Sequence, residues 1–253
     1  MHANRIVMKL RLLSSRLTVT IASLAAALVL AGCASTGGES SASAGAQPSS
    51  KFKLADGRTV DIGTSSPAEG GGMNYKNRHL EKCWLADGFD FNGYDTLYIA
   101  PVLSTAKFHQ ENPEEVKVHD LAKENLVAEL TRKINSKKIF NNVVTRESDL
   151  KPDVKSLKLE NTITEFTKGG GAARYFVGLY GGGQPVLRVQ GKITDGNKSL
   201  FTFEARRSGV SAGARMSGVF MKDEDIQMED IRSMVLDLTD FVAIIAKKEP
   251  LRQ

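Results

Sequence analysis

The stretch LRVQGKITDGNKSLFTFEAR, Leu187–Arg206, consists of two alternating runs joined by a turn. In each run apolar residues alternate with polar or charged ones, which is the pattern of a strand with one buried face. The apolar positions are Leu187, Val189 and Ile193 in the first run and Phe201, Phe203 and Ala205 in the second. Asp195-Gly196-Asn197 between the runs is typical of a tight hairpin turn. The stretch therefore predicts an antiparallel hairpin with strands over about 186–194 and 199–206.

More strands are predicted on the N-terminal side of this hairpin. Asp95–Val102 (DTLYIAPV) has apolar residues on both faces, as a central buried strand has. Ile139–Thr145 is a short strand, and apolar residues alternate with polar ones again in Leu157–Ile163. A smaller hairpin, KFKL and RTVDI, surrounds an Asp-Gly turn in residues 51–63, and a Ser- and Gly-rich loop follows over Thr64–Gly72.

Two amphipathic helices are predicted as well. The first starts at Asn112, a favourable N-cap, with Pro113 and two acids in the first turn, and continues to about Lys138. The second spans about Glu224–Lys248. Its apolar face consists of Ile231, Met234, Val235, Leu238, Phe241, Val242 and Ile245. The order strand, helix, several antiparallel strands, helix predicts an α+β fold, in which a mostly antiparallel sheet carries both amphipathic helices on one face.

The N-terminus has the three parts of a bacterial lipoprotein signal peptide. Residues 1–16 contain four basic and no acidic residues, and Leu17–Ala31 is an uncharged apolar run of 15. That run is shorter than the about 20 residues that a transmembrane helix needs. It ends in Leu30-Ala31-Gly32-Cys33, which resembles the lipobox. We therefore expect removal of residues 1–32 and lipidation of Cys33; the alternative is a plain signal peptide with a chance cysteine.

The residues after Cys33 indicate how the protein is held and where. Ser35–Ser50 is rich in Ser, Gly and Ala, so residues 33–50 are expected to form a lipidated cysteine with a flexible tether. Several acyl chains on one cysteine give stable anchoring in a membrane. Ala34 follows the cysteine, and a residue other than Asp there is typical of sorting to the outer membrane. We expect a lipid-anchored protein of the outer membrane that faces the periplasm.

Composition narrows the class of protein. Hydrophobic residues make up 41% and charged residues 25%, as in ordinary globular proteins. Two cysteines exclude a disulfide-stapled scaffold and a Cys-rich zinc site. The 34 lysines and arginines exceed the 29 acids, but four basic residues lie in the expected signal peptide, which leaves 30 against 29. A nearly neutral mature chain argues against nucleic acid as a partner.

The expected organisation has a small N-terminal extension and one main domain. Residues 51–88 are interpreted as a hairpin and loop outside the domain, and residues 89–250 as the globular α+β domain. Cys83 lies in the extension beside Trp84. Its simplest interpretation is a buried small apolar residue. The alternative, open in an oxidising compartment, is an intermolecular disulfide.

Two motifs of serine enzymes occur without their partners. Gly209–Gly213 matches G-x-S-x-G around Ser211, but no histidine follows it in the chain. Ser104–Lys107 matches S-x-x-K, but no Lys-Thr-Gly occurs. We therefore predict no catalytic residue.

Metal and cofactor sites are not expected either. His109 and His119 lack neighbouring ligands in metal spacing, and no phosphate-binding glycine motif is present. The acids of Asp223–Asp225 lie where a helix N-terminus favours negative charge. We therefore expect neither a metal site nor a cofactor.

Gly169–Gly183 (GGGAARYFVGLYGGG) is a short aromatic segment between glycines. Its large side chains Tyr175, Phe176, Leu179 and Tyr180 are spaced to share one face. One interpretation is that they cover the end of the domain's own core. The other is that they form a partner-binding patch, because aromatic anchors often dominate binding energy.

The lipobox, the YDTLYIAPV strand, the GAARYFVGLYGGG segment and the PVLRVQGKI strand together resemble one bacterial lipoprotein family. It is the family known as domain of unknown function 4410, and the resemblance covers about Phe89–Lys248. The family is similar in architecture to the curli-secretion lipoprotein and to the N-terminal domain of the translocation protein TolB. That similarity concerns the fold and transfers no activity.

Three functions remain open. The expected one is an outer-membrane-anchored lipoprotein with a non-catalytic periplasmic domain that binds an envelope protein partner or assembles with itself. The alternatives are a component of an oligomeric secretion or envelope-assembly complex and a cell-envelope hydrolase. Charge is uneven: residues 166–222 carry a net +7 and residues 223–240 a net −6. We expect these two segments to neutralise each other, with a basic surface for anionic polymers as the alternative.

Overall fold

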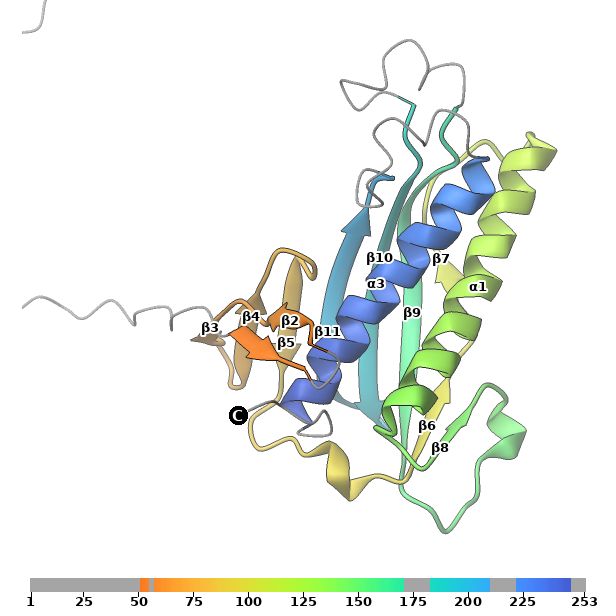
Figure 1. Cartoon of the computed structure of the whole chain (residues 1–253). Helices are drawn as coiled ribbons and strands as arrows, with labels where there is room; N and C mark the ends of the chain where they lie inside the picture. Colours follow the sequence, from red (N-terminus) through yellow and green to blue (C-terminus); the bar gives the residue numbers. More distant parts are fainter. Residues whose placement is uncertain (1–50, 55–56, 171–182, 210–221, 247–253) are drawn as a thin grey trace, which may run out of the picture. The chain divides into compact units, whose positions relative to one another are not determined.

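The structure is a computed structural model that describes residues 51–54, 57–170, 183–209 and 222–246 (Figure 1). In this part of the chain one mixed sheet carries two long helices on one face. The sheet order is β3-β4-β5-β11-β10-β9-β6-β8, and β7 also pairs with β9. The strands are β3 (Thr64–Pro67), β4 (Met73–Lys76), β5 (Lys82–Leu85), β6 (Thr96–Ile99), β7 (Leu103–Ser104), β8 (Asn142–Val144), β9 (Ser156–Thr167), β10 (Val186–Asp195) and β11 (Lys198–Arg207).

Most of the pairs in this sheet are antiparallel. The predicted hairpin is present as β10 and β11, and β9 pairs with the other edge of β10 in the same sense. The strand β6 instead runs parallel to both β8 and β9, because the chain crosses back over the sheet through a helix after β6. The predicted α+β class with a mostly antiparallel sheet is confirmed.

The two helices match their predicted positions closely. The helix α1 spans Pro113–Lys137, and the side chain of Asn112 accepts hydrogen bonds from the N–H groups of Glu114 and Glu115 at 3.1 and 3.4 Å. It ends where Lys138 adopts a left-handed conformation, with φ 52°. The helix α3 spans Asp223–Ile245. Figure 1 shows α1 and α3 side by side across one face of the sheet.

A single core lies between these helices and the sheet. All six apolar positions of the predicted hairpin are buried, with at most 5% exposure. Phe201 of β11 stacks on Phe241 of α3 with ring centroids 6.0 Å apart, and Tyr75 of β4 meets the same ring edge-on at 5.3 Å. The alternation in the sequence therefore points the apolar side chains toward the helices.

The N-terminal segment differs from its prediction. The first hairpin is present as β1 (Lys51–Lys53) and β2 (Thr59–Asp61), which form a separate small sheet. However, β3, β4 and β5 extend the main sheet through the pairing of β5 with β11, and Leu80 and Cys83 join the core. Contrary to the interpretation of residues 51–88 as an extension outside the domain, residues 64–85 therefore belong to the main sheet, and only the β1–β2 hairpin forms a sheet of its own. Strands of four residues are too short for their alternation to show this in the sequence.

Cys83 lies on the helix-covered side of β5 and is 3% exposed. Burial raises the pKa of its thiol to about 12, so the reactive thiolate is scarce at neutral pH. The structure supports the simpler interpretation, a small core residue, because an intermolecular disulfide would require local unfolding.

The remaining regular segments are two turns of 3-10 helix, Phe91–Gly93 and Glu147–Asp149. Phe91 is buried and packs edge-on against Phe140, with centroids 5.9 Å apart, so the first turn closes one end of the core. Of the helices among the described residues, none has the length and apolar character required to cross a bilayer.

Candidate functional site

The face of the sheet opposite α1 and α3, called here the open face, carries the alternate side chains of the same strands. The register aligns these side chains in rows that cross the sheet. The first row consists of Ser66, Asn74, Trp84, Thr202, Lys192 and Glu160. The second row consists of Lys82, Glu204, Gln190, Thr162 and Leu103. The open face is therefore mainly polar.

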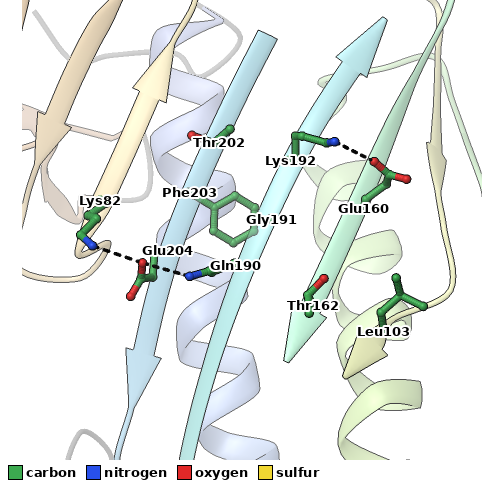
Figure 2. A pocket seen from close by; sticks show the side chains of 10 residues that line it. All are labelled: Lys82, Leu103, Glu160, Thr162, Gln190, Gly191, Lys192, Thr202, Phe203 and Glu204. Atoms are coloured by element: carbon green, nitrogen blue, oxygen red, sulfur yellow. Dashed lines mark hydrogen bonds and ion pairs between the residues drawn. The ribbon is translucent and has the colours of Figure 1, made fainter. Parts of the chain in front are cut away.

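A hollow of about 510 Å³ lies over the middle of the open face, and Figure 2 looks onto it. Hydroxyl and amide groups of Thr162, Gln190 and Thr202 line it, together with the backbone at Gly191. Leu103 of β7 lies at its margin and is 65% exposed. The hollow thus combines hydrogen-bonding groups with two large apolar side chains, Leu103 and Phe203.

The charged side chains around the hollow are paired with one another. Lys192 lies 3.4 Å from Glu160, and Lys82 lies 3.6 Å from Glu204 on the other side. Gln190 donates a hydrogen bond to Glu204 at 3.3 Å. Because these charges compensate each other, the hollow has little net field to offer a charged ligand.

An ion-pair network continues along the open face. Arg188 and Arg206 each place Nε 3.1 Å from Oε2 of Glu165, and Arg188 also bonds to Glu81 at 2.8 Å and to Glu204. The hydrogen bond from Arg206 holds the pKa of Glu165 below its ordinary value, and the one from Arg188 does the same for Glu204. These carboxylates are ionised at neutral pH, so the network ties β5, β9, β10 and β11 together by charge-assisted bonds.

A second hollow of about 520 Å³ adjoins the first over β3, β4 and β5. The two share Lys82 and Thr202 in their linings. Trp84 lies in the second hollow, and its indole N–H donates to the carbonyl of Gly71 at 3.0 Å. The polar edge of this ring is thus satisfied within the protein.

Position 191 requires a glycine, because a side chain there would overlap its neighbours. Its Cα faces the helix-covered side, where an added Cβ would come within 2.0 Å of the Phe203 ring and 2.9 Å of the Asn161 side-chain oxygen. Phe203 fills the space directly opposite the glycine in the register. The missing side chain lets a large aromatic ring pack beneath the floor of the first hollow.

Ser104 and His119, which share no sequence motif, are neighbours in the structure. Ser104 Oγ lies 2.9 Å from His119 Nε2, although the residues come from β7 and α1. The imidazole is 5% exposed, stacks on Phe108 at 4.3 Å and meets Phe166 edge-on at 4.9 Å. Burial lowers the pKa of His119, so the ring is neutral at pH 7. Asp120 Oδ1 is 3.5 Å from Nδ1, at the limit of a hydrogen bond.

Other residues singled out in the sequence do not form a site. His109 is exposed and lies 3.2 Å from Glu115, and the described part of the chain has no cluster of metal-ligating side chains. Cys33, Ser211 and the segment with Tyr175, Phe176, Leu179 and Tyr180 lie outside the described residues. Their predicted roles stay predictions.

The expected mutual neutralisation of the basic and acidic segments is found at one described pair. Arg207 of β11 lies 2.6 Å from Asp237 of α3. Among the other described pairs, Arg188 and Arg206 bond to strand glutamates, and Lys168 bonds to Glu114 of α1. The acidic side chains of α3 also pair with lysines of α1, Glu224 with Lys117 and Asp240 with Lys137. Most of these described pairs therefore do not join the basic segment to the acidic one, which the linear charge pattern does not reveal.

The open face itself is the feature that sequence analysis did not single out. Its one signal was the set of polar positions that alternate with the apolar ones in β9, β10 and β11. Which of these residues adjoin depends on the register between strands that are distant in the chain.

Comparison with known proteins supports the family resemblance. The family model described as Domain of unknown function (DUF4410) matches residues 90–213, which confirms the resemblance seen in the sequence. No curated protein matches the chain significantly.

The chain also matches several solved structures. The PelC dodecamer from Paraburkholderia phytofirmans matches with a TM-score of 0.36 and 13% identity, over 60% of this chain and 96% of that one. The hypothetical protein CT253 from Chlamydia trachomatis matches with a TM-score of 0.34 and 10% identity, over 59% and 99% of the two chains. Protein XCC0632 from Xanthomonas campestris matches with a TM-score of 0.30 and 13% identity, over 62% and 91%. These scores are too low to bear on function.

Proposed function

We propose, from the premise that residues 90–213 carry a DUF4410 domain, that the protein is an outer-membrane-anchored lipoprotein with a non-catalytic periplasmic domain. In this proposal Cys33 carries the lipid, residues 33–50 form the tether, and the domain docks envelope partners through its open face. The observation that carries the proposal is the polar open face with its hollow of about 510 Å³.

The two faces of the sheet differ in whether their side chains must be shielded from water. A single helical layer already buries the apolar side of the sheet, and Phe203, for example, is 5% exposed. The open face is stable without cover because its charges are paired. It nevertheless presents hydroxyl or amide side chains on β3, β4, β9, β10 and β11, which suits a surface that meets partners.

The anchor is tested by the variant Cys33→Ser. Mass spectrometry of the mature protein should find an N-terminal, triacylated Cys33, and the variant should leave the membrane fraction because the acyl chains are its anchor. An unmodified cysteine, or a mature chain that begins elsewhere, contradicts this part of the proposal.

The docking face is tested by photocrosslinking in cells. A photoreactive amino acid at Gln190, on the open face, should yield adducts, whereas the same group at Glu124, exposed on α1, should yield few. Adducts to a second copy of this chain would favour the alternative of an oligomeric assembly. Equal or absent adducts at the two positions contradict docking through the open face.

The hydrolase alternative has one specific observation in its favour, the 2.9 Å contact of Ser104 with His119. We interpret the hydroxyl as the partner of a buried imidazole, because the Asp120 contact at 3.5 Å is too long to orient the ring well. A fluorophosphonate probe should therefore leave the protein unlabelled. Stoichiometric labelling that disappears in Ser104→Ala would establish the hydrolase instead.

A further inference from the structure

The two hollows of the open face form one elongated binding surface. They adjoin at Lys82 and Thr202, and together their linings run from β7 across β9, β10, β11, β5 and β4 to β3. Neighbouring strands lie about 4.8 Å apart, so the path across seven strands measures roughly 29 Å. A ligand that follows this path is extended and crosses the strands.

The lysines and glutamates that line this path are equal in number. Its lining contains three lysines and three glutamates. They are Lys76, Lys82 and Lys192, with Glu81, Glu160 and Glu204. Lys82 and Lys192 are paired with lining glutamates, and Glu81 accepts from Arg188 at 2.8 Å. A polyanion or polycation would gain little from such a surface.

The remaining groups are those that bind an uncharged, hydroxyl-rich chain. Hydroxyl and amide side chains offer both donors and acceptors. They include Ser66, Asn74, Thr202, Gln190 and Thr162. The large apolar or aromatic side chains of the lining, Leu103, Phe203, Tyr75 and Trp84, come singly from four different strands, which disfavours an amphipathic helix as the occupant.

Trp84 supplies an aromatic surface in the middle of this polar path. It lies between Asn74 and Thr202 in the first row. Its N–H is bonded to Gly71, and Gly72 lies so close beneath the ring that an added Cβ would be 2.7 Å from Nε1. The ring is thus fixed in place with its polar edge occupied, so a ligand meets its apolar surface.

We propose that the open face binds an extended, uncharged polysaccharide. This inference rests on the proposed function, since it names the occupant of the same face. Sugar hydroxyls would exchange hydrogen bonds with the Thr, Ser, Asn and Gln side chains, and the C–H face of one sugar ring would lie on Trp84. The rows repeat at the strand spacing, which suits a ligand made of repeated units.

Trp84 is the single tryptophan of the chain, so its fluorescence reports on this surface alone. The full-length lipoprotein in a detergent without sugar headgroups is titrated with dextran, laminarin and hydroxyethylcellulose. Alginate serves as a polyanionic comparison. We expect a saturable change in Trp84 emission with at least one neutral glucan, and retarded migration in a native gel that contains it.

The hydroxyls are tested by a volume-conserving pair, Thr162→Val with Thr202→Val. Loss of two hydrogen bonds should weaken binding about tenfold. The matched control is Thr59→Val on β2, outside both hollows, which should bind like the wild type. Trp84→Phe should retain binding in the gel and Trp84→Ala should lose it, with circular dichroism to check that each variant is folded.

The proposal is overturned if no neutral glucan changes the emission or the migration, if alginate alone binds, or if the double valine variant binds as tightly as Thr59→Val. Its failure is separable from failure of the proposed function. Protein adducts at Gln190 without glucan binding would leave the docking face standing with a protein as its occupant. Absence of both adducts and glucan binding would remove the docking face itself.

Discussion

The two faces of strands β10 and β11 have the same backbone and opposite chemistry. On the helix-covered face, Leu187, Val189 and Phe201 are completely buried. On the open face, one residue along the chain in each case, Arg188, Gln190 and Thr202 remain accessible. The comparison teaches that one alternating pattern produces both a buried apolar face and an accessible polar face, because neighbouring side chains in a strand point to opposite faces. Stability should depend on one face and recognition on the other.

The largest expected effect on stability comes from truncating a core side chain, and a change at the next residue, on the open face, is its control. Phe201→Ala should lower the free energy of unfolding by about 3–5 kcal/mol, because it leaves a cavity against Phe241. Thr202→Ala, the next residue, should change it by less than about 1 kcal/mol. Urea unfolding monitored by circular dichroism measures both. Similar losses of unfolding free energy for the two variants would contradict the idea that stability depends mainly on the helix-covered face.

Gly191→Ala tests the packing of the Phe203 ring against β10 on the helix-covered face. The added methyl should cost about 1–3 kcal/mol, since it would overlap the Phe203 ring. The smaller side chain of Phe203→Leu should relieve part of that cost, so the two changes should be non-additive in a double-mutant cycle of unfolding free energies. A neutral or stabilising Gly191→Ala would show that the ring moves freely out of the way.

The pH dependence of stability should come from groups buried on the helix-covered side. Asp230 of α3 is 1% exposed and accepts the Gly209 N–H at 2.7 Å, while Arg207 and Glu229 are the charged groups that act on it. Burial raises the pKa of Asp230 to about 6, above the 3.8 of a free side chain. The folded state therefore takes up its proton first as pH falls, and this stabilisation is lost as pH rises through about 6. Between pH 7 and 5 the wild type should gain about 1 kcal/mol relative to Asp230→Asn.

His119 should act in the opposite direction. Burial lowers the pKa of its imidazole below 6.5, so the folded state resists protonation and stability is lost as pH falls through 6.5. Relative to His119→Gln, the wild type should therefore lose stability between pH 7 and 5, as measured by urea unfolding at both values. Equal pH profiles for Asp230→Asn and His119→Gln would contradict this assignment.

The smallest expected effect concerns the ion pairs of the open face. Arg188→Met removes bonds to Glu81, Glu165 and Glu204. Because Arg188, Glu81 and Glu165 stay partly accessible to water, the loss should stay near 1 kcal/mol. Because salt screens such pairs, the difference from the wild type should shrink at 1 M NaCl. A large, salt-independent loss would show that the network acts as part of the core.

Much of the fold could be predicted from sequence because its signals are local. Asn112 and Pro113 start α1 as predicted, and the Asp-Gly turn after residue 194 joins β10 to β11. Most of the candidate site could not be predicted from the sequence. Thr162, Gln190 and Thr202 are ordinary polar positions in three strands, and only the register makes them neighbours. Ser104 and His119 could not be paired from the sequence, because nothing in the chain between them indicates that β7 and α1 bring them to 2.9 Å.

The sequence by itself determined the periodicities, the helix starts and the turn, since these depend on residues within one or two turns or strand steps of each other. Tertiary structure alone decided that β5 joins β11, that β6 runs parallel to β9, and that Arg58 reaches Asp240 across 182 positions of the chain. The physical reason is that strand pairing uses backbone hydrogen bonds, which nearly every residue can make. The partner of a strand is therefore selected by burial of the whole apolar face under α1 and α3, a property of the assembled core and of no single segment.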